Sequence, residues 1–143
     1  MLGELKGEIV VIDTMVFAYA LLGVEEGEEA LAILEKTKTV IVPDSFRAEF
    51  ANVLWQWVRF RQVSEEVACA AMERTEVLID IVVGSEEVWL SALQLAIASN
   101  HPVYDALFVA TAMMQDEKVV TYDKKLQSKF PDRVLSPQAF LAL

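Results

Sequence analysis

Four acidic residues stand in stretches of the chain that are otherwise apolar: Asp13, Glu49, Asp105 and Asp123. Asp13 and Asp123 each end a short β-branched run, whereas Glu49 and Asp105 lie in segments of helical composition. A carboxylate drawn into a low dielectric must be paired, protonated or bound to a metal ion. Neither Asp13 nor Asp105 has a Lys or Arg beside it in the sequence. These four acids are therefore the candidates for a chemical site.

A group of carboxylates offers the all-oxygen ligands that hard divalent cations prefer, and Mg²⁺ takes one or two carboxylates together with water and phosphate oxygens. Two such ions about 3.5–4 Å apart activate a water and stabilise the leaving oxygen of a phosphodiester. No protein nucleophile is required, so the expected products carry a 3′-hydroxyl and a 5′-phosphate. The pattern indicates metal-dependent hydrolysis of a phosphodiester.

Each acid also has a purely structural interpretation. Asp13 and Asp123 precede predicted helices and are suitable N-caps for them. Asp105 is placed to cap the helix that follows it or to pair with a distant arginine. Glu49 is a poor partner for Arg47, because residues two apart do not share a helix face. One acid is easily explained in this way, but four together, two of them at strand ends, favour a common site.

The elements that would position these acids follow from the hydrophobic pattern. We predict short, mostly β-branched strands at 9–12, 40–42, 81–83, 119–121 and 134–135. We predict helices at 14–22, 25–38, 45–61 and 103–114, and from 64, 85, 124 and 136 onward. Short apolar strands that alternate with helices predict an α/β domain with a parallel sheet. Ligands of such sheets bind beyond the carboxyl ends of the strands, where Asp13 and Asp123 lie.

Composition limits the class of protein. The chain has 143 residues, of which 55% are hydrophobic and 24% charged, so we expect one folded domain, 1–143, and not a disordered chain. One cysteine and one histidine exclude a disulfide framework and a site of several cysteines or histidines. The chain has no signal-peptide pattern and no apolar run of ~18 residues. We expect a cytoplasmic protein without a membrane segment.

The charge balance is strongly acidic, with 12 Lys and Arg against 22 Asp and Glu and a net charge of −10. Proteins that clamp nucleic acid by charge are usually basic. Any nucleic-acid contact must therefore be local or mediated by metal ions. The candidate phosphate contacts are Arg59, Arg61, Lys124 and Lys125.

Four segments, in order along the chain, resemble the acidic motifs of the PIN-domain family, and the likeness is greatest to VapC-type toxins of prokaryotic toxin–antitoxin pairs. The segments are 10–14, 49–54, 104–110 and 120–126. The resemblance implies a three-layer α/β/α fold with a central, mainly parallel sheet of four to five strands. It also implies a Mg²⁺- or Mn²⁺-dependent endoribonuclease that acts on RNA. Such proteins are commonly homodimers and are held inactive by a cognate antitoxin.

The resemblance also assigns roles to the four acids and to two polar residues. Asp13 and Asp105 would be the principal metal ligands, and Glu49 and Asp123 would complete the acidic pocket directly or through water. The polar residues are Asn52 and Thr121. Asn52 lies one helical turn after the motif's glutamate, so both would face the pocket, and Thr121 matches a position from which a hydroxyl orients a neighbouring acid.

One residue departs from the family pattern. Many relatives have Asn or Ser two residues after the first aspartate, where this chain has Met15. A thioether cannot donate a hydrogen bond to a phosphate or a water. The alternative function is therefore a catalytically weak or inactive module that binds a partner. A phosphoacceptor receiver domain has a similar size, but it would need two adjacent acids at the end of the first strand, where Asp13 stands alone.

The remaining unusual side chains have ordinary interpretations. We interpret His101 as a helix cap or surface residue and not as a general base. We expect Cys69 to be a small buried hydrophobe, and Met113 and Met114 to belong to the core.

Two tryptophans on one predicted helix point in different directions. Trp55 and Trp57 are about 200° apart around the helix axis, so they cannot face the same core stripe. Either a neighbouring element buries the second ring, or that ring marks an exposed interface for a subunit or an antitoxin.

Overall fold

The computed structural model describes residues 9–143, and residues 1–8, which include the start examined for a signal peptide, lie outside this range. A five-stranded sheet forms the centre of the fold, with strand order β3-β2-β1-β4-β5. All four strand pairings are parallel. The strands are β1 (Ile9–Ile12), β2 (Thr39–Pro43), β3 (Ile81–Val83), β4 (Lys118–Val120) and β5 (Val134–Leu135).

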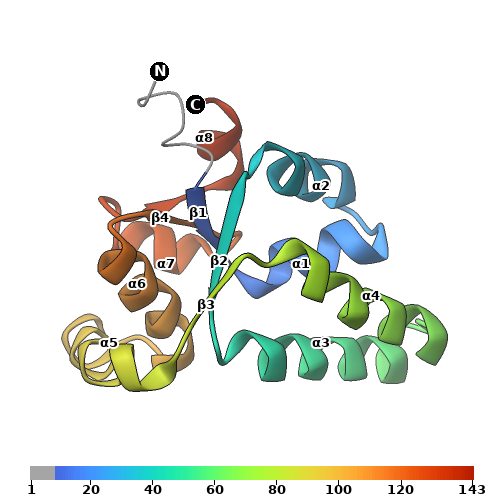
Figure 1. Cartoon of the computed structure of the whole chain (residues 1–143), viewed down its shortest axis with the longest axis horizontal. Helices are drawn as coiled ribbons and strands as arrows, with labels where there is room; N and C mark the ends of the chain where they lie inside the picture. Colours follow the sequence, from blue (N-terminus) through green and yellow to red (C-terminus); the bar gives the residue numbers. More distant parts are fainter. Residues whose placement is uncertain (1–8) are drawn as a thin grey trace.

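Eight helices are described in residues 9–143, and they connect the strands or follow the last one (Figure 1). They are α1 (Thr14–Leu22), α2 (Gly27–Lys36), α3 (Phe46–Phe60), α4 (Glu65–Leu78), α5 (Ser85–Ser99), α6 (Val103–Gln115), α7 (Lys124–Lys129) and α8 (Pro137–Leu141).

The helices cover the sheet from both sides, which confirms the three-layer α/β/α prediction. Side chains of β1 alternate: Val10 and Ile12 pack with α1–α4 and α8, whereas Val11 packs with α5–α7. This alternation is the two-residue period of a strand that is buried on both faces. Figure 1 shows the two helical layers on opposite sides of the strands.

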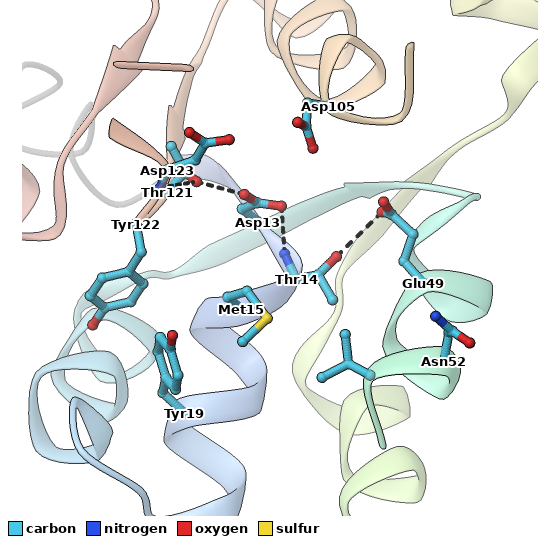
Figure 2. A pocket seen from close by; sticks show the side chains of 11 residues that line it. Asp13, Thr14, Met15, Tyr19, Glu49, Asn52, Asp105, Thr121, Tyr122 and Asp123 are labelled. Carbon is cyan, nitrogen blue, oxygen red and sulfur yellow. Dashed lines mark hydrogen bonds between the residues drawn. The ribbon is translucent and has the colours of Figure 1, made fainter. Parts of the chain in front are cut away.

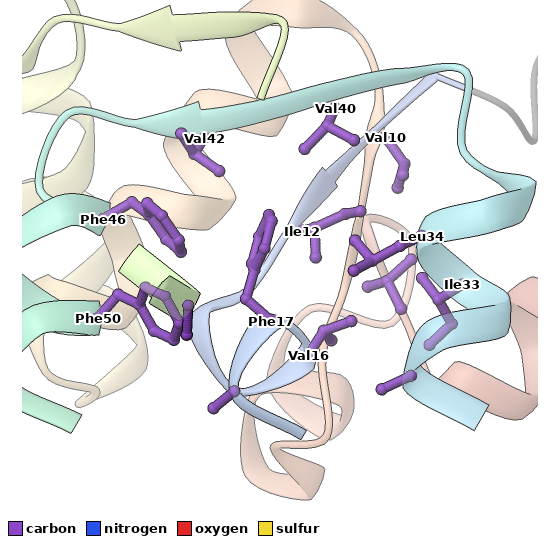
Figure 3. Packing of buried hydrophobic residues seen from close by; sticks show 14 of the residues in the cluster. Val10, Ile12, Val16, Phe17, Ile33, Leu34, Val40, Val42, Phe46 and Phe50 are labelled. Carbon is purple, nitrogen blue, oxygen red and sulfur yellow. The ribbon is translucent and has the colours of Figure 1, made fainter. Parts of the chain in front are cut away.

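Aromatic packing fixes α3 against α1. The ring centroids of Phe17 and Phe46 are 4.7 Å apart, and those of Phe46 and Phe50 are 5.4 Å apart. All three side chains are fully buried (Figure 3). Because these rings hold the first turns of the two helices together, Thr14 and Glu49 are brought close in space although 35 residues separate them.

The helix ends show which caps form. Asp13, Ser64, Asp123 and Ser136 each accept a hydrogen bond from a backbone N–H of the helix that follows. At the start of α3, Ser45 makes no such bond, and the carboxylate of Asp44 accepts the backbone N–H of Ser85 instead. The helix predicted at 25–38 is shorter, since a turn precedes it at 24–26.

Three burial predictions are wrong. Cys69 is exposed, because the buried positions of α4 are Ala68 and Ala71 and the cysteine is rotated away from them. Met113 and Met114 are 49% and 43% exposed, because they follow the last buried residue of α6.

Within residues 9–143, no helix has both the length and the apolar character needed to cross a membrane.

Candidate functional site

A cavity of about 450 Å³ opens at the carboxyl ends of β1 and β4 (Figure 2). The sheet order reverses at this point, because the chain adds β2 and β3 on one side of β1 and then returns to add β4 and β5 on the other. Ligands of open α/β sheets bind at such switch points. All six predicted site residues line the cavity: Asp13, Glu49, Asn52, Asp105, Thr121 and Asp123.

Asp13 follows the last residue of β1 and is held by two hydrogen bonds. Its Oδ1 accepts from the backbone N–H of Thr14 at 2.8 Å, and its Oδ2 accepts from the hydroxyl of Thr121 at 2.5 Å. The first bond caps α1, and the second links the end of β1 to the residue after β4. The capping interpretation is therefore correct for Asp13, and the capping carboxylate faces the cavity as well.

Thr121 and Asp123 form the neighbouring wall of the cavity. Thr121 is fully buried, and its hydroxyl oxygen accepts the backbone N–H of Asp123 at 3.0 Å while its hydrogen goes to Asp13. Asp123 caps α7 through Oδ1, which accepts from the N–H groups of Lys125 and Leu126 at 2.9 and 3.2 Å. Because Oδ1 is engaged in the cap, Oδ2 is the oxygen left to face the site.

Glu49 reaches the cavity from the first turn of α3. Its Oε2 accepts a hydrogen bond from the hydroxyl of the buried Thr14 at 3.4 Å. Arg47 pairs instead with Glu76, with Nε 3.0 Å from Oε1, as expected from the poor 47–49 spacing. Asn52 lies one turn further along α3 and lines the same cavity, so the predicted common orientation of Glu49 and Asn52 is present (Figure 2).

Asp105 enters from the first turn of α6 and is paired with a residue that the sequence interpretation placed elsewhere. His101 Nε2 lies 2.9 Å from Asp105 Oδ2 and 3.8 Å from Asp123 Oδ2. His101 is only 8% exposed. The interpretation of His101 as a cap or surface residue is wrong, and so is the expectation that Asp105 caps its helix or pairs with an arginine.

Electrostatics show that the carboxylates are poorly compensated. Burial raises the pKa of Asp13 from 3.8 to about 6, and the charges of Asp105 and Asp123 add to the shift against the two hydrogen bonds. Burial and the charges of Asp13 and Asp105 raise the pKa of Glu49 from 4.5 to about 7. Burial also raises the pKa of Asp105, although His101 opposes the shift. The site therefore has an excess of negative charge near neutral pH.

The donor set fits a hard divalent cation. Within residues 9–143, Asp105 Oδ1 and Glu49 Oε1 accept no hydrogen bond, so carboxylate oxygens remain available at the cavity. The ligand atoms of His101, Asp105 and Asp123 lie within 4.8 Å of one another. Carboxylate oxygens suit Mg²⁺ and Mn²⁺, and a bound cation would stabilise the ionised carboxylates against the burial and the mutual repulsion that raise their pKa values.

Thr14 and Lys129 were missed as functional candidates because their partners are distant in sequence, and His101 was missed although one partner is close. Thr14 donates to Glu49, and Lys129 Nζ lies 3.2 Å from His101 Nδ1. The single local signal was the i,i+4 spacing of His101 and Asp105, which brings side chains together on a helix. Pro102 lies between them, and α6 begins only at residue 103, so this spacing was not read as helical.

Two aromatic residues, Met15 and Val53 complete the lining. Met15, Tyr19 and Tyr122 line the cavity, and the two tyrosine rings meet edge to face with centroids 5.1 Å apart (Figure 2). The hydroxyl of Tyr122 donates to Glu29 Oε1 at 3.0 Å. Burial and the contact with Glu29 raise the pKa of this tyrosine, so it stays neutral. The thioether of Met15 stands where a hydrogen-bond donor was expected.

A second hollow lies between α3 and α4 and is mainly apolar, with a volume of about 310 Å³. Trp55 borders it and is 58% exposed, whereas Trp57 is 6% exposed and packs in the core. The two tryptophans therefore divide as the helix geometry requires. Cys69 also borders this hollow.

The fold and the site together describe an α/β protein with a five-stranded parallel sheet between two helical layers. Its acids converge at the switch point of the sheet. Comparisons identify the family: residues 10–130 match the model of the PIN domain. The chain is also 31% identical over 123 residues to "Ribonuclease VapC3" of Pyrobaculum aerophilum, covering 85% of this chain and 94% of that protein. The chain belongs to the PIN-domain family.

Solved structures agree with this fold. The crystal structure of PAE2754 from Pyrobaculum aerophilum superposes with a TM-score of 0.70 at 16% identity, covering 95% of this chain and 88% of that one. A toxin–antitoxin complex from Klebsiella pneumoniae contains a chain with a TM-score of 0.64 at 19% identity, covering 90% of this chain and 97% of that one. These likenesses confirm the fold.

Proposed function

We propose that this protein is a Mg²⁺- or Mn²⁺-dependent endoribonuclease, the toxin component of a VapBC-type toxin–antitoxin pair. The observation that carries the proposal is the convergence of Asp13, Glu49, Asp105 and Asp123 on one cavity at the switch point of the sheet. Raised pKa values of the first three acids indicate a site that lacks compensating positive charge. The 31% identity to a ribonuclease over most of both chains supports the same reaction class.

The chain's own residues orient the acids. Thr121 fixes Asp13, the first turn of α7 fixes Asp123, and Thr14 contacts Glu49. We propose Asp13 and Asp105 as the principal metal ligands, with the other two acids completing the pocket directly or through water. A divalent cation held there supplies the positive charge that attracts a phosphodiester and promotes ionisation of the attacking water. Asn52 lines the cavity, and we propose that it contacts substrate or supports the site.

The proposal includes two protein partners and a location. A structural neighbour is a toxin–antitoxin complex, which supports a cognate antitoxin as partner. The exposed Trp55 and the apolar hollow beside it offer an interface for a protein helix. We further propose that the chain, residues 1–143, is a single domain, forms a homodimer and acts in the cytoplasm.

A metal titration followed by thermal unfolding tests the site. We expect Mg²⁺ or Mn²⁺ to raise the Tm of the wild type, because bound cation stabilises the folded state by mass action. Asp13→Asn and Asp105→Asn should lose this rise and should cleave RNA at least about 10²-fold more slowly, since each removes a proposed ligand. Products of the wild type should carry 5′-phosphates.

Asp132→Asn is the matched control, because it removes one carboxylate from an exposed position outside the cavity. It should keep both the metal-dependent rise in Tm and the cleavage rate. A wild type whose Tm does not respond to millimolar Mg²⁺ or Mn²⁺ would contradict the proposal.

One observation favours the second candidate, a PIN module that binds a partner but cleaves weakly: Met15 lines the cavity at the position of the expected donor. Met15→Ser restores a hydroxyl. If Met15 limits catalysis, this variant should cleave RNA about tenfold faster, the effect of about 1.4 kcal/mol from one hydrogen bond to a charged group. Equal rates for the two proteins, with metal bound in both, would show that Met15 is not limiting.

A further inference from the structure

His101 lies between two acids of the cavity, Asp105 and Asp123, and the ammonium group of Lys129. Its Nε2 lies 2.9 Å from Asp105 Oδ2, and its Nδ1 lies 3.2 Å from Lys129 Nζ. The imidazole side chain is 4% exposed, so both ring nitrogens depend on protein partners. Lys129 is itself positioned, because its ammonium also donates to the backbone carbonyl of Asn100 at 2.9 Å.

The lysine determines which ring nitrogen carries the hydrogen. An ammonium group has three donors and no acceptor, so Nδ1 of His101 must accept the hydrogen bond from Lys129. A neutral imidazole has one donor and one acceptor. The hydrogen therefore resides on Nε2, which points at Asp105 and lies within 3.8 Å of Asp123 Oδ2.

This tautomer distinguishes two roles for His101. The ligand atoms of His101, Asp105 and Asp123 lie close enough together to hold a cation jointly, but an imidazole nitrogen that carries a hydrogen cannot ligate a metal ion. Ligation through Nε2 would require the hydrogen on Nδ1, where it would face the ammonium of Lys129. The contacts therefore favour a donor over a ligand.

We propose that His101 is a positioning residue: Lys129 holds it in the Nε2–H tautomer, and the Nε2–H group fixes Oδ2 of Asp105 so that Oδ1 faces the cavity. Asp105 then joins two acids that protein donors already hold, since Thr14 and Thr121 hold the two oxygens of Asp13 and the start of α7 holds Oδ1 of Asp123. The consequence for metal affinity rests on the proposed function, whereas the tautomer does not.

Nitrogen NMR of the imidazole tests the tautomer directly. His101 is the one histidine of the 143-residue sequence, so the spectrum needs no assignment. We expect the neutral imidazole to carry its hydrogen on Nε2, both before and after addition of Mg²⁺. A hydrogen on Nδ1, on both nitrogens, or a transfer to Nδ1 when Mg²⁺ is added would overturn the proposal.

Lysine variants test what sets the tautomer. In Lys129→Met the Nδ1 atom loses its donor, and we expect the signals of the two nitrogens to move toward a mixture of tautomers. Lys118→Met is the matched control, because Lys118 also donates to a backbone carbonyl, that of Asp132, but lies away from the cavity. The control spectrum should equal that of the wild type. An unchanged spectrum in Lys129→Met would contradict the role of the lysine.

Calorimetry with Mn²⁺ and Mg²⁺ tests the consequence for metal binding. His101→Gln places an amide N–H near the position of Nε2, whereas His101→Leu keeps the volume and removes the donor. We expect the leucine variant to bind the ions roughly 10–100-fold more weakly, the usual effect of losing the partner of a ligating carboxylate, and the glutamine variant to retain most of the affinity.

The outcomes separate this proposal from the proposed function. The positioning role alone is overturned if wild type and His101→Leu bind the ions equally well, provided that circular dichroism shows the variant to be folded. If His101→Leu fails to fold, the glutamine variant decides, because a loss of affinity as large as that from removing Asp105 would make His101 a ligand. A wild type that binds neither ion overturns the proposed function and the effect on metal affinity, while the spectrum still reads the tautomer.

Discussion

Asp13 accepts two hydrogen bonds and still has a raised pKa, because burial and the charges of Asp105 and Asp123 outweigh the stabilisation of its ionised form. Thr121 donates one of those bonds and therefore does two things at once. It limits the rise in pKa, and it fixes the position of a proposed metal ligand. The ionised form of Asp13, the residue that caps α1, is therefore destabilised unless a positive charge binds nearby.

The raised pKa of Asp13 predicts how the free energy of unfolding depends on pH. The folded protein binds the Asp13 proton up to about pH 6, whereas the unfolded chain releases it near 3.8. Between these values the folded state holds more protons, so the free energy of unfolding of the metal-free protein should fall as pH rises. Glu49 extends the window to about pH 7. Urea unfolding of wild type and Asp13→Asn from pH 4 to pH 7 measures the effect.

We expect the stability of Asp13→Asn relative to wild type to increase by about 1–3 kcal/mol over that range, since one pKa unit corresponds to about 1.4 kcal/mol. The comparison also includes the effect of the Asp13 charge on the pKa of Glu49, which the variant removes. Saturating Mg²⁺ should remove the advantage of the variant. A difference that is constant with pH would show that the pKa of Asp13 is not raised in the folded protein.

At the scale of elements, α3 contributes its first turn to the acidic cavity and one face to the hydrophobic core. Phe46 and Phe50 pack against α1 and thereby place Glu49 beside Thr14. Further along the helix, Trp57 is buried while Trp55 is 58% exposed beside the hollow between α3 and α4. One helix therefore links the acidic cavity to an apolar surface.

The two tryptophans form a matched pair for testing this division. Trp57→Ala should reduce the free energy of unfolding by about 3–5 kcal/mol, the usual effect of emptying a buried aromatic position. Trp55→Ala should change it by about 0.5 kcal/mol or less, as for most surface positions. Urea unfolding gives both values. Similar losses in the two variants would mean that the surface beside Trp55 is part of the folded core.

The elements show what the sequence permits and where it fails. The central strands were predictable because their β-branched runs are buried on both faces, as in β1 and β2. The meeting of Asp13 with Asp123 followed from parallel strand direction. Cys69 was misassigned because a rotation of one position on α4 separates burial from exposure. His101 was misassigned because one of its partners, Lys129, lies 28 residues away in the sequence and meets the ring only through tertiary packing.

At the scale of the molecule, an acidic protein is proposed to act on an acidic polymer. The net charge of −10 opposes the approach of RNA, so the proposed activity requires the proposed cations at the cavity or a few basic residues. The basic candidates are Arg59, Arg61, Lys124 and Lys125. Two of them contact aromatic rings. The Arg61 guanidinium lies 4.7 Å from the ring centroid of Trp57, and the Arg59 guanidinium lies 5.7 Å from the ring centroid of Phe60.

The balance of charge predicts an unusual salt dependence. Raising KCl from about 0.01 to 0.15 M shortens the Debye length from about 30 to 8 Å and screens the repulsion between protein and RNA. At fixed, saturating Mg²⁺ we expect kcat/KM for RNA cleavage to stay constant or to rise across this range. Proteins that bind nucleic acid through many basic contacts lose affinity steeply instead.

Two measurements control this experiment. The metal-induced rise in Tm, followed over the same salt range, shows that the cation remains bound. The double variant Lys124→Ala/Lys125→Ala measures the local basic contribution at the start of α7, next to the cap residue Asp123. A steep fall of kcat/KM with salt in the wild type, abolished in the double variant, would show that these lysines govern approach. RNA would then be recruited by a basic patch on an acidic protein, and the cations at the four acids would serve the chemical step and not the encounter.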